Sequence, residues 1–301
     1  NIGYWHGNFM PRRNPQYDWS QPVDGTTSAT EWQGLHEPAE MVTIINPANG
    51  WLQNCNATPF TAAGTASPNR SNFPTYMAPD AENYRGINAV NVWRNAQVLT
   101  IDKVIAGGYT RKLPAFDDMI PALARAWANR PYLADSSVKQ LEQAIGLMTA
   151  WDRQSDYGSI ATTLAIEWAQ RLLPAIQRMP TPNTPNAGFI EKAQAYLQQA
   201  QPLELIQPLQ ATLNDLRYRF PSWQVPWGEI NRYQRLTGKL QETYSDTLPS
   251  IPARFAAATW GALPSYVSRQ MNGSARRYGF SGNSFICAVE FGDKVSAKSL
   301  L

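Results

Sequence analysis

Two asparagines, Asn54 and Asn56, lie on either side of a cysteine in the segment INPANGWLQNCNATPF, residues 45–60. The NPANG stretch predicts a tight β-hairpin, so both amides are expected just beyond the end of a strand. There an asparagine can direct its side-chain NH2 group into a pocket while the sheet holds its backbone. Such a group can stabilise the oxyanion that forms during amide hydrolysis. The alternative is that both asparagines only bond to backbone groups of the loop.

Other residues that could act as nucleophiles or metal ligands are sparse. Cys55 and Cys287 lie far apart, and His6 and His36 are the two histidines of the chain, so neither a zinc spacing nor a papain-like pattern is present. Buried, reduced thiols are the favoured interpretation of the cysteines, and one disulfide in an exported protein is the alternative. His6 lies within a strand pattern, which favours a structural role over that of a general base.

Composition excludes two classes of function. The 301 residues are 43% hydrophobic and 16% charged, so the chain can bury a large core. The net charge of +3 comes without a basic run, so nucleic-acid binding is not expected. An apolar stretch of about eighteen residues is absent, and the first residues do not have a signal-peptide pattern. These features indicate a globular protein that does not span a membrane.

The pattern divides the chain into three parts, residues 1–80, 81–245 and 246–301. The first combines short β-like runs with Gly-, Pro- and Asn-rich loops. The second has apolar residues at helical spacing. Its predicted helices lie in TIDKVIAGGY, with an N-cap at Thr100, and in PAFDDMIPALARAWANR, SSVKQLEQAIGLMTAW, TTLAIEWAQRLLPAIQRM, FIEKAQAYLQQA and LELIQPLQATLNDLRYRF.

The third part ends in NSFICAVEFGDKVSAKSLL, which is typical of a buried strand. We therefore predict an α+β fold in which a block of helices is inserted between two parts of a sheet. Residues 1–65 and 275–301 are expected to meet in one sheet. Such a sheet would still have open edges, which indicates that further strands complete it.

Several segments resemble the large β subunit of penicillin acylases and acyl-homoserine-lactone acylases. These segments are NIGYWHGNFMPRR, GTTSATEWQGL, INPANGWLQNCNATPF, YRGINA and SGNSFICAVEFGDKVSAKSL, in that order. The most specific match is NP-x-x-G-x-x-x-N-x-N-x-[ST]-P, formed by Asn46, Pro47, Gly50, Asn54, Asn56, Thr58 and Pro59. The resemblance implies an N-terminal-nucleophile hydrolase with an αββα sandwich and a large helical insertion. In that family an autocatalytic cut frees a serine at the start of the β chain.

The resemblance also implies roles for individual residues. It assigns the oxyanion-stabilising amide to Asn56 and leaves Asn54 as a buried hydrogen-bonding residue of the turn. Arg85 aligns best with an arginine that lies near the nucleophile in the family, with Arg70 and Arg94 as alternatives. The family's structural calcium has no clear counterpart here apart from Asp80, so no metal or cofactor is assigned.

The chain begins at Asn1, which lacks the hydroxyl or thiol that an N-terminal nucleophile needs. We therefore expect a fragment of a larger acylase precursor that is inactive alone and acts with its α subunit and the remaining β-chain segments on a small acylated amide. The resemblance also implies a periplasmic or secreted bacterial protein. The acyl group stays open among β-lactam, lactone and general N-acyl amide substrates.

Two other functions fit the composition. Eleven tryptophans could form a non-catalytic module that binds carbohydrate or peptide, and the helices could form an interaction domain. Trp93, Trp127, Trp151 and Trp168 nevertheless fall at helical spacings with other apolar residues. This spacing favours a role in core packing.

Overall fold

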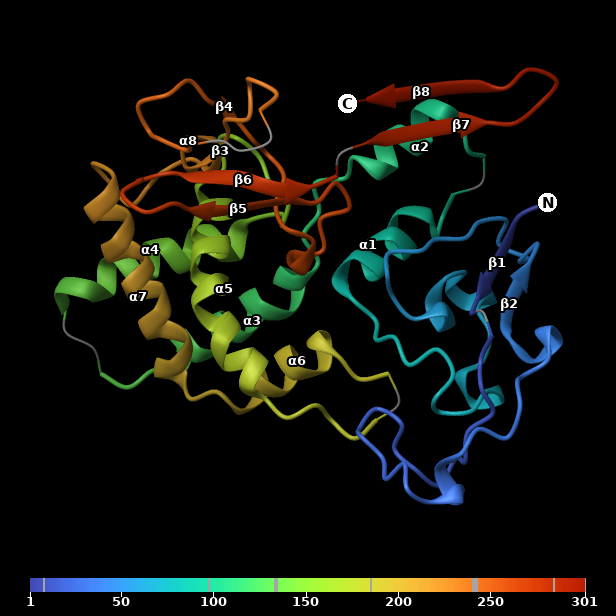
Figure 1. Ribbon diagram of the computed structural model, residues 1–301. Helices are drawn as coiled ribbons and strands as arrows, with labels where there is room; N and C mark the ends of the chain where they lie inside the picture. Colours follow the sequence, from blue (N-terminus) through green and yellow to red (C-terminus); the bar gives the residue numbers. More distant parts are fainter. Residues whose placement is uncertain are drawn as a thin grey trace.

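The computed structural model describes residues 1–7, 9–96, 98–132, 135–184, 186–239, 243–283 and 285–300. A block of helices lies between an N-terminal region of loops with one small sheet and a C-terminal region of strands (Figure 1). The predicted α+β class and the large helical insertion are thus confirmed. The exact division of the chain near residues 80 and 245 remains a prediction.

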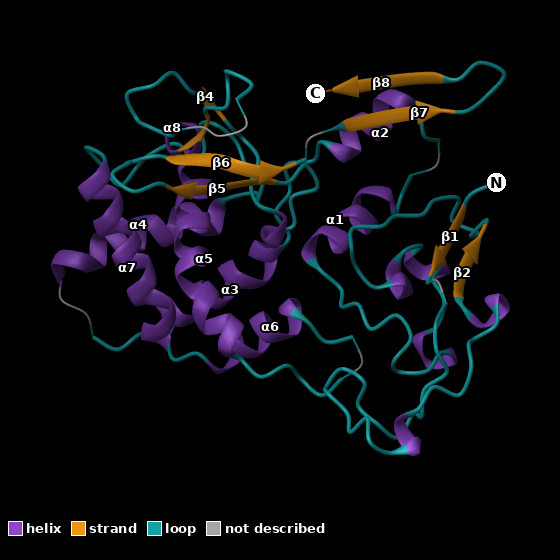
Figure 2. Cartoon of the chain, viewed as in Figure 1, coloured by secondary structure: helices purple, strands orange, loops and turns teal. Residues whose placement is uncertain are grey.

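The N-terminal region consists of long loops around a two-stranded antiparallel sheet (Figure 2). Strand β1, Gly3–His6, pairs with β2, Val42–Ile45, and His6 lies opposite Val42. Val42 and Ile44 are buried, whereas Thr43 and Ile45 are exposed, which is the alternation of a sheet with one covered face. Asn46 accepts a hydrogen bond from the backbone of Ile2 at 2.9 Å and so closes the open end of this sheet.

The hairpin predicted at NPANG does not form. The backbone turns there, with a 2.9 Å bond from Gly50 N to Pro47 O, but the following residues do not pair with β2. Trp51 is instead buried, and its ring packs beside Gly64 and toward the helix that follows. Burial of this large side chain outweighs local pairing, because a fully buried aromatic ring contributes more than a few cross-strand contacts.

All six predicted helices are formed, and the bounds of the helices are as follows. They are α1 Tyr84–Trp93, α2 Ile101–Gly108, α3 Ala115–Ala128, α4 Asp135–Ala150, α5 Ile160–Arg178, α6 Phe189–Gln199, α7 Pro202–Arg219 and the short α8 Trp227–Ile230. The predicted N-cap of α2 is confirmed, since the hydroxyl of Thr100 accepts from Lys103 N at 3.3 Å. In the part of the chain that the structure describes, none of these helices has the length and apolarity needed to cross a bilayer.

One large core joins the helices. Phe116, Leu123 and Trp168 are almost fully buried in it, and the Trp168 ring nitrogen donates to Leu205 O at 2.9 Å. Trp151 packs against Phe116. Trp151 and Trp168 are therefore core residues, as their spacing predicted, whereas Trp93 and Trp127 are half-buried.

The C-terminal strands form two further sheets. The first has the order β4-β3-β6-β5, with β3 Asn231–Tyr233, β4 Ile251–Pro252, β5 Tyr266–Gln270 and β6 Arg277–Gly282. The second is an antiparallel hairpin of β7, Ile286–Glu290, and β8, Ser296–Leu300. The predicted extended structure is confirmed in this hairpin, but its prediction as a buried strand is wrong, because Ala288 is the only buried residue among the described residues of β7 and the large apolar side chains Val289, Phe291 and Val295 are exposed. Ser284 and Leu301 lie outside the described residues.

The prediction that residues 1–65 and 275–301 share one sheet is wrong for the described residues. There β2 pairs with β1, and β7 pairs with β8, as two separate two-stranded sheets (Figure 1). The sequence shows that each segment favours a strand, but the choice of partner depends on contacts between residues far apart in the chain. Ala256, Trp260 and Ala262 pack into the helical core.

Helix α1 is anchored on two sides. The Tyr84 hydroxyl donates to Asp118 of α3 at 2.8 Å, and the Asn88 amide donates to Gly261 O at 2.7 Å. Gly261 has φ +96°, and an added Cβ would lie 2.5 Å from the ring of Pro114. This close approach, together with the positive φ, explains the glycine. The core thus holds the helix whose first turn carries Arg85.

Candidate functional site

Asn56 lies at the surface in a strained but well-bonded turn. Its backbone N donates to the side-chain oxygen of Asn54 at 2.9 Å, which is an Asx-type bond. Asn56 has φ +55°, a left-handed conformation that asparagine tolerates better than most residues. Asn54 is a hydrogen-bonding residue of the turn, as predicted, but it is exposed rather than buried. Its loss should therefore cost less than the ~1–3 kcal/mol of a buried bond.

The structure brings Arg85 to Asn56. One nitrogen of the guanidinium, Nη2, donates to the side-chain oxygen of Asn56 and to Cys55 O, both at 2.7 Å. Arginine has no acceptor, so the Asn56 atom that faces it must be the oxygen. The NH2 group of Asn56 therefore points away from Arg85. Among the described residues, no protein group accepts a hydrogen bond from it.

Asn83 completes the contact between the loop and α1. It is the N-cap of this helix, and its side-chain oxygen accepts from Gly86 N at 3.0 Å. Its NH2 group donates to Cys55 O at 3.0 Å and to Asn56 O at 3.1 Å. Neither Asn83 nor the helix that it caps was predicted from the sequence, although an asparagine directly before apolar residues at helical spacing is a recognisable N-cap signal.

The first turn of α1 lies directly against the loop. A Cβ added at Gly86 would be 3.1 Å from the Cβ of Ala57 and 2.2 Å from a carboxylate oxygen of Glu82. Thr58 N also donates to Ala81 O at 3.1 Å. The loop and the helix are therefore packed and hydrogen-bonded together, which is the support that a preorganised donor needs.

The neighbouring thiol is poorly suited to act as a nucleophile. Burial raises the pKa of Cys55, and the positive charge of Arg85 offsets this only in part. The thiol therefore stays protonated near neutral pH, whereas the thiolate is the reactive form. Cys55 is half-buried and Cys287 is exposed, and both are free. The prediction of two buried thiols is wrong for Cys287, and the alternative disulfide does not form.

The other two arginines considered from the sequence lie elsewhere. Arg70 donates to Asn186 and to three backbone carbonyls of residues 73–75, so it holds a loop together. Arg94 follows the opposite end of α1 and lines a cavity of about 350 Å3 together with Trp51, Ile87 and Val90. Of the three, Arg85 is the arginine that contacts Asn56.

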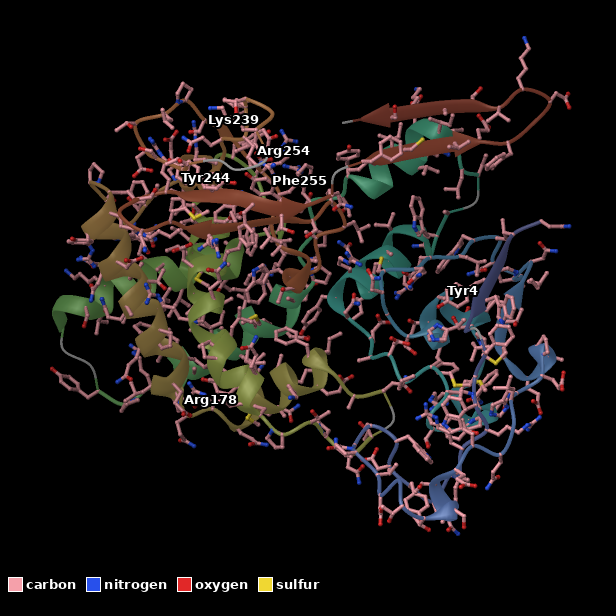
Figure 3. The ribbon with its side chains drawn as sticks, viewed as in Figure 1. Tyr4, Arg178, Lys239, Tyr244, Arg254 and Phe255 are labelled. Carbon is pink, nitrogen blue, oxygen red and sulfur yellow. The ribbon has the colours of Figure 1, made fainter. Side chains whose placement is uncertain are left out.

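His6 has the structural surroundings that its strand pattern predicted. Its Nδ1 lies 3.1 Å from the hydroxyl of Tyr4, and the two rings are stacked. Tyr4 is labelled on β1 in Figure 3. Its Nε2 lies 3.2 Å from a carboxylate oxygen of Asp80. Asp80 is thus tied to β1. Within the described ranges, no group of three or more His, Cys, Asp or Glu side chains could hold a metal ion.

Glu82 is a half-buried carboxylate beside the site. One of its oxygens accepts from Thr61 at 2.5 Å and the other from Asn83 N at 2.8 Å. Burial raises the pKa of Glu82 and outweighs these hydrogen bonds, with a smaller contribution from the negative charge of Glu191. The folded protein therefore binds this proton more tightly than the unfolded chain does.

This raised pKa predicts a pH dependence of stability. The free energy of unfolding should fall as the pH rises from the ordinary carboxyl pKa, ~4.3, to the higher folded pKa of Glu82, because the folded state then loses a proton it favours. Glu82→Gln should remove this part of the slope, because an amide does not titrate. The amide can still accept from Asn83 N and donate to the hydroxyl of Thr61, so the local contacts are kept. Urea unfolding of the 301-residue chain across this pH range measures the effect.

Glu40 provides the matched control for this measurement. A bond from Glu37 N and the guanidinium of Arg12 lower the pKa of Glu40, so Glu40→Gln should change the pH slope in the opposite direction. Identical slopes in the wild type and Glu82→Gln would show that Glu82 is solvated as freely in the folded protein as in the unfolded chain.

Comparisons with known proteins agree with the residue pattern. The family model described as penicillin amidase matches residues 1–301. The fold is similar to the solved structure of a thermostable penicillin G acylase from Alcaligenes faecalis, in orthorhombic form, with a TM-score of 0.55 and 17% sequence identity. The match covers 99% of this chain and 55% of that chain, so this chain spans about half the length of that acylase.

Proposed function

Because the chain belongs to the penicillin amidase family, we propose that it carries part of the active site of an acylase-like hydrolase that cleaves a linear N-acyl amide. The observation that carries this proposal is the contact between Asn56 and Arg85. Both residues were assigned through the family resemblance of the sequence, 29 positions apart, and a 2.7 Å hydrogen bond joins their side chains. Their arrangement leaves the NH2 group of Asn56 at the surface without a protein acceptor among the residues that the structure describes.

The free NH2 group of Asn56 suits oxyanion stabilisation. A nucleophile that attacks the amide carbon converts the carbonyl oxygen into an oxyanion, and the carbon–nitrogen bond then breaks to release the amine. A donor that is already fixed in place favours this charged state without reorganising. Arg85 holds the Asn56 oxygen and so fixes the direction of the opposite NH2 group. Its positive charge also lies close to the developing negative charge.

We propose that the nucleophile comes from another segment of the same precursor, together with the groups that select the acyl chain. The support for this is that the match covers 55% of the acylase chain, and that the Cys55 thiol is a poor nucleophile. The α subunit and further β-chain segments would be the partners of this chain. Export to the periplasm or beyond is proposed on the family resemblance alone.

The test of this function is the loss of activity when Arg85 is changed in the complete protein expressed from its full reading frame. Arg85→Ala should lower kcat/KM for a chromogenic phenylacetyl or long-chain acyl amide by ~10–10²-fold, the equivalent of a charged hydrogen bond. Arg94→Ala, at the other end of the same helix, is the matched control and should leave kcat/KM near the wild-type value. Equal activity in all three proteins would contradict the proposed site.

A further inference from the structure

Asn83 bonds to the backbone on both sides of the contact between the loop and α1. Its NH2 group reaches two consecutive carbonyls of the loop, those of Cys55 and Asn56, and its oxygen reaches the first turn of α1 at Gly86. A side-chain amide offers two donors and one carbonyl acceptor, so all its hydrogen-bonding groups are used here. An N-cap needs only the oxygen, and the two further bonds to the loop require another explanation.

The bonds of Asn83 converge with those of its neighbours. The carbonyl of Cys55 accepts from both Asn83 and Arg85, which satisfies both of its lone pairs. The backbone N of Asn56 is bound by Asn54, and the backbone O of Asn56 is bound by Asn83. Both backbone polar groups of Asn56 are thus held by asparagine side chains. This matters because the left-handed conformation at φ +55° is otherwise unfavourable.

We propose that Asn83 is a positioning residue of the hydrolytic reaction, which aligns the amide of Asn56 with the guanidinium of Arg85. The inference rests on the proposed function of these two residues. Asn83 lies next to the reacting groups without contacting the substrate, and it acts through Asn56. Because Arg85 follows Asn83 by two residues in the first turn of α1, the same side chain fixes the loop and the base of the arginine.

Two substitutions separate this role from helix capping. Asn83→Asp keeps an oxygen that can accept from Gly86 N, and a negative charge is favourable at a helix N-terminus, so α1 should stay folded. The same substitution removes the NH2 group and places an oxygen against the two loop carbonyls. Asn83→Ser also keeps a capping oxygen, adds no charge that could attract Arg85, and is too short to reach the loop.

The experiment measures kcat, KM and melting temperature in the complete protein with a chromogenic N-acyl amide. Both Asn83 variants should lose ~10–10²-fold in kcat, the effect of a small misplacement of a catalytic group, with little change in KM or melting temperature. In an Asn56→Ala background, neither substitution should reduce kcat further, because the donor that Asn83 positions is already gone. Asn69→Asp is the matched control, since Asn69 caps the short helix at Arg70–Asn72 through the same type of bond.

The results of this experiment distinguish the positioning role of Asn83 from the proposed function of Asn56 and Arg85. Wild-type kcat in both Asn83 variants, with a large loss in Asn56→Ala, would overturn the positioning role and leave the function standing. Effects of Asn83 and Asn56 that add in the double variants would also overturn it, as would a melting temperature that falls in step with kcat. Wild-type activity in both Asn56→Ala and Arg85→Ala would instead contradict the proposed function itself.

Discussion

Replacing Asn56 with alanine in the complete protein is expected to lower kcat by ~10²–10³ and to leave KM nearly unchanged. The reason is that the Asn56 NH2 group would bond strongly to the substrate oxygen only when negative charge develops on it. The Asn56 side chain is exposed, and its oxygen accepts from Arg85. Its removal leaves Arg85 with the carbonyl of Cys55 as an acceptor. Steady-state kinetics with an N-acyl amide and a parallel melting curve measure the two effects.

Two further variants make this expectation specific. Asn56→Asp keeps the shape of the side chain and an oxygen for Arg85 but lacks the donor, so it should lose at least as much activity while the chain stays folded. Asn54→Ala removes the 2.9 Å bond to Asn56 N and should reduce the rate only through misplacement of Asn56. If Asn56→Ala keeps wild-type kcat, or if the effects of the Asn54 and Asn56 variants are exchanged, then the asparagine pair belongs to the turn and not to catalysis.

The second large effect is expected at Glu167, a buried carboxylate between two arginines. Its oxygens lie 2.7 Å from Arg219 of α7 and 2.8 Å from Arg277 of β6, and all three side chains are at most 8% exposed. Glu167→Gln would keep the shape but leave the buried guanidinium of Arg277 without a compensating charge, and Arg219 with only the partly exposed Asp215 as its acidic partner. We expect a loss of ~3–5 kcal/mol in the free energy of unfolding. Urea unfolding of the 301-residue chain measures it.

Asp215 provides the matched control. It also contacts Arg219, at 2.8 Å, but its side chain is 31% exposed, so Asp215→Asn should cost less than ~1 kcal/mol. An equally small loss in the free energy of unfolding for Glu167→Gln would show that water solvates the two arginines in the folded protein.

The pH dependence gives an independent measure of the same group. Burial alone raises the pKa of Glu167, but the two guanidinium groups outweigh it and hold the pKa below its usual range. A depressed folded pKa contributes stability that is present above the unfolded value, ~4.3, and is lost as the pH falls through the folded pKa. The difference between the wild type and Glu167→Gln should therefore be largest above this value and shrink in acid.

The local patterns of the sequence determined the helices, and the family resemblance of the sequence selected the pair of residues at the site. Apolar residues at helical spacing identified α2 to α7, because a helix depends on contacts between residues three or four positions apart. The asparagine motif and the downstream arginine selected Asn56 and Arg85. The motif reflects a local turn, in which Asn54 bonds to a residue only two positions away.

Tertiary structure alone decided which strands pair and how the site is held. The turn after β2 leads to a buried Trp51 instead of a hairpin, and β7 pairs with β8 instead of joining the N-terminal sheet. Asn83 clamps the carbonyls of residues more than 25 positions before it, and Glu167 meets Arg277 from 110 positions away. Such contacts depend on how the elements pack in three dimensions, and they cannot be predicted from the spacing of residues along one chain.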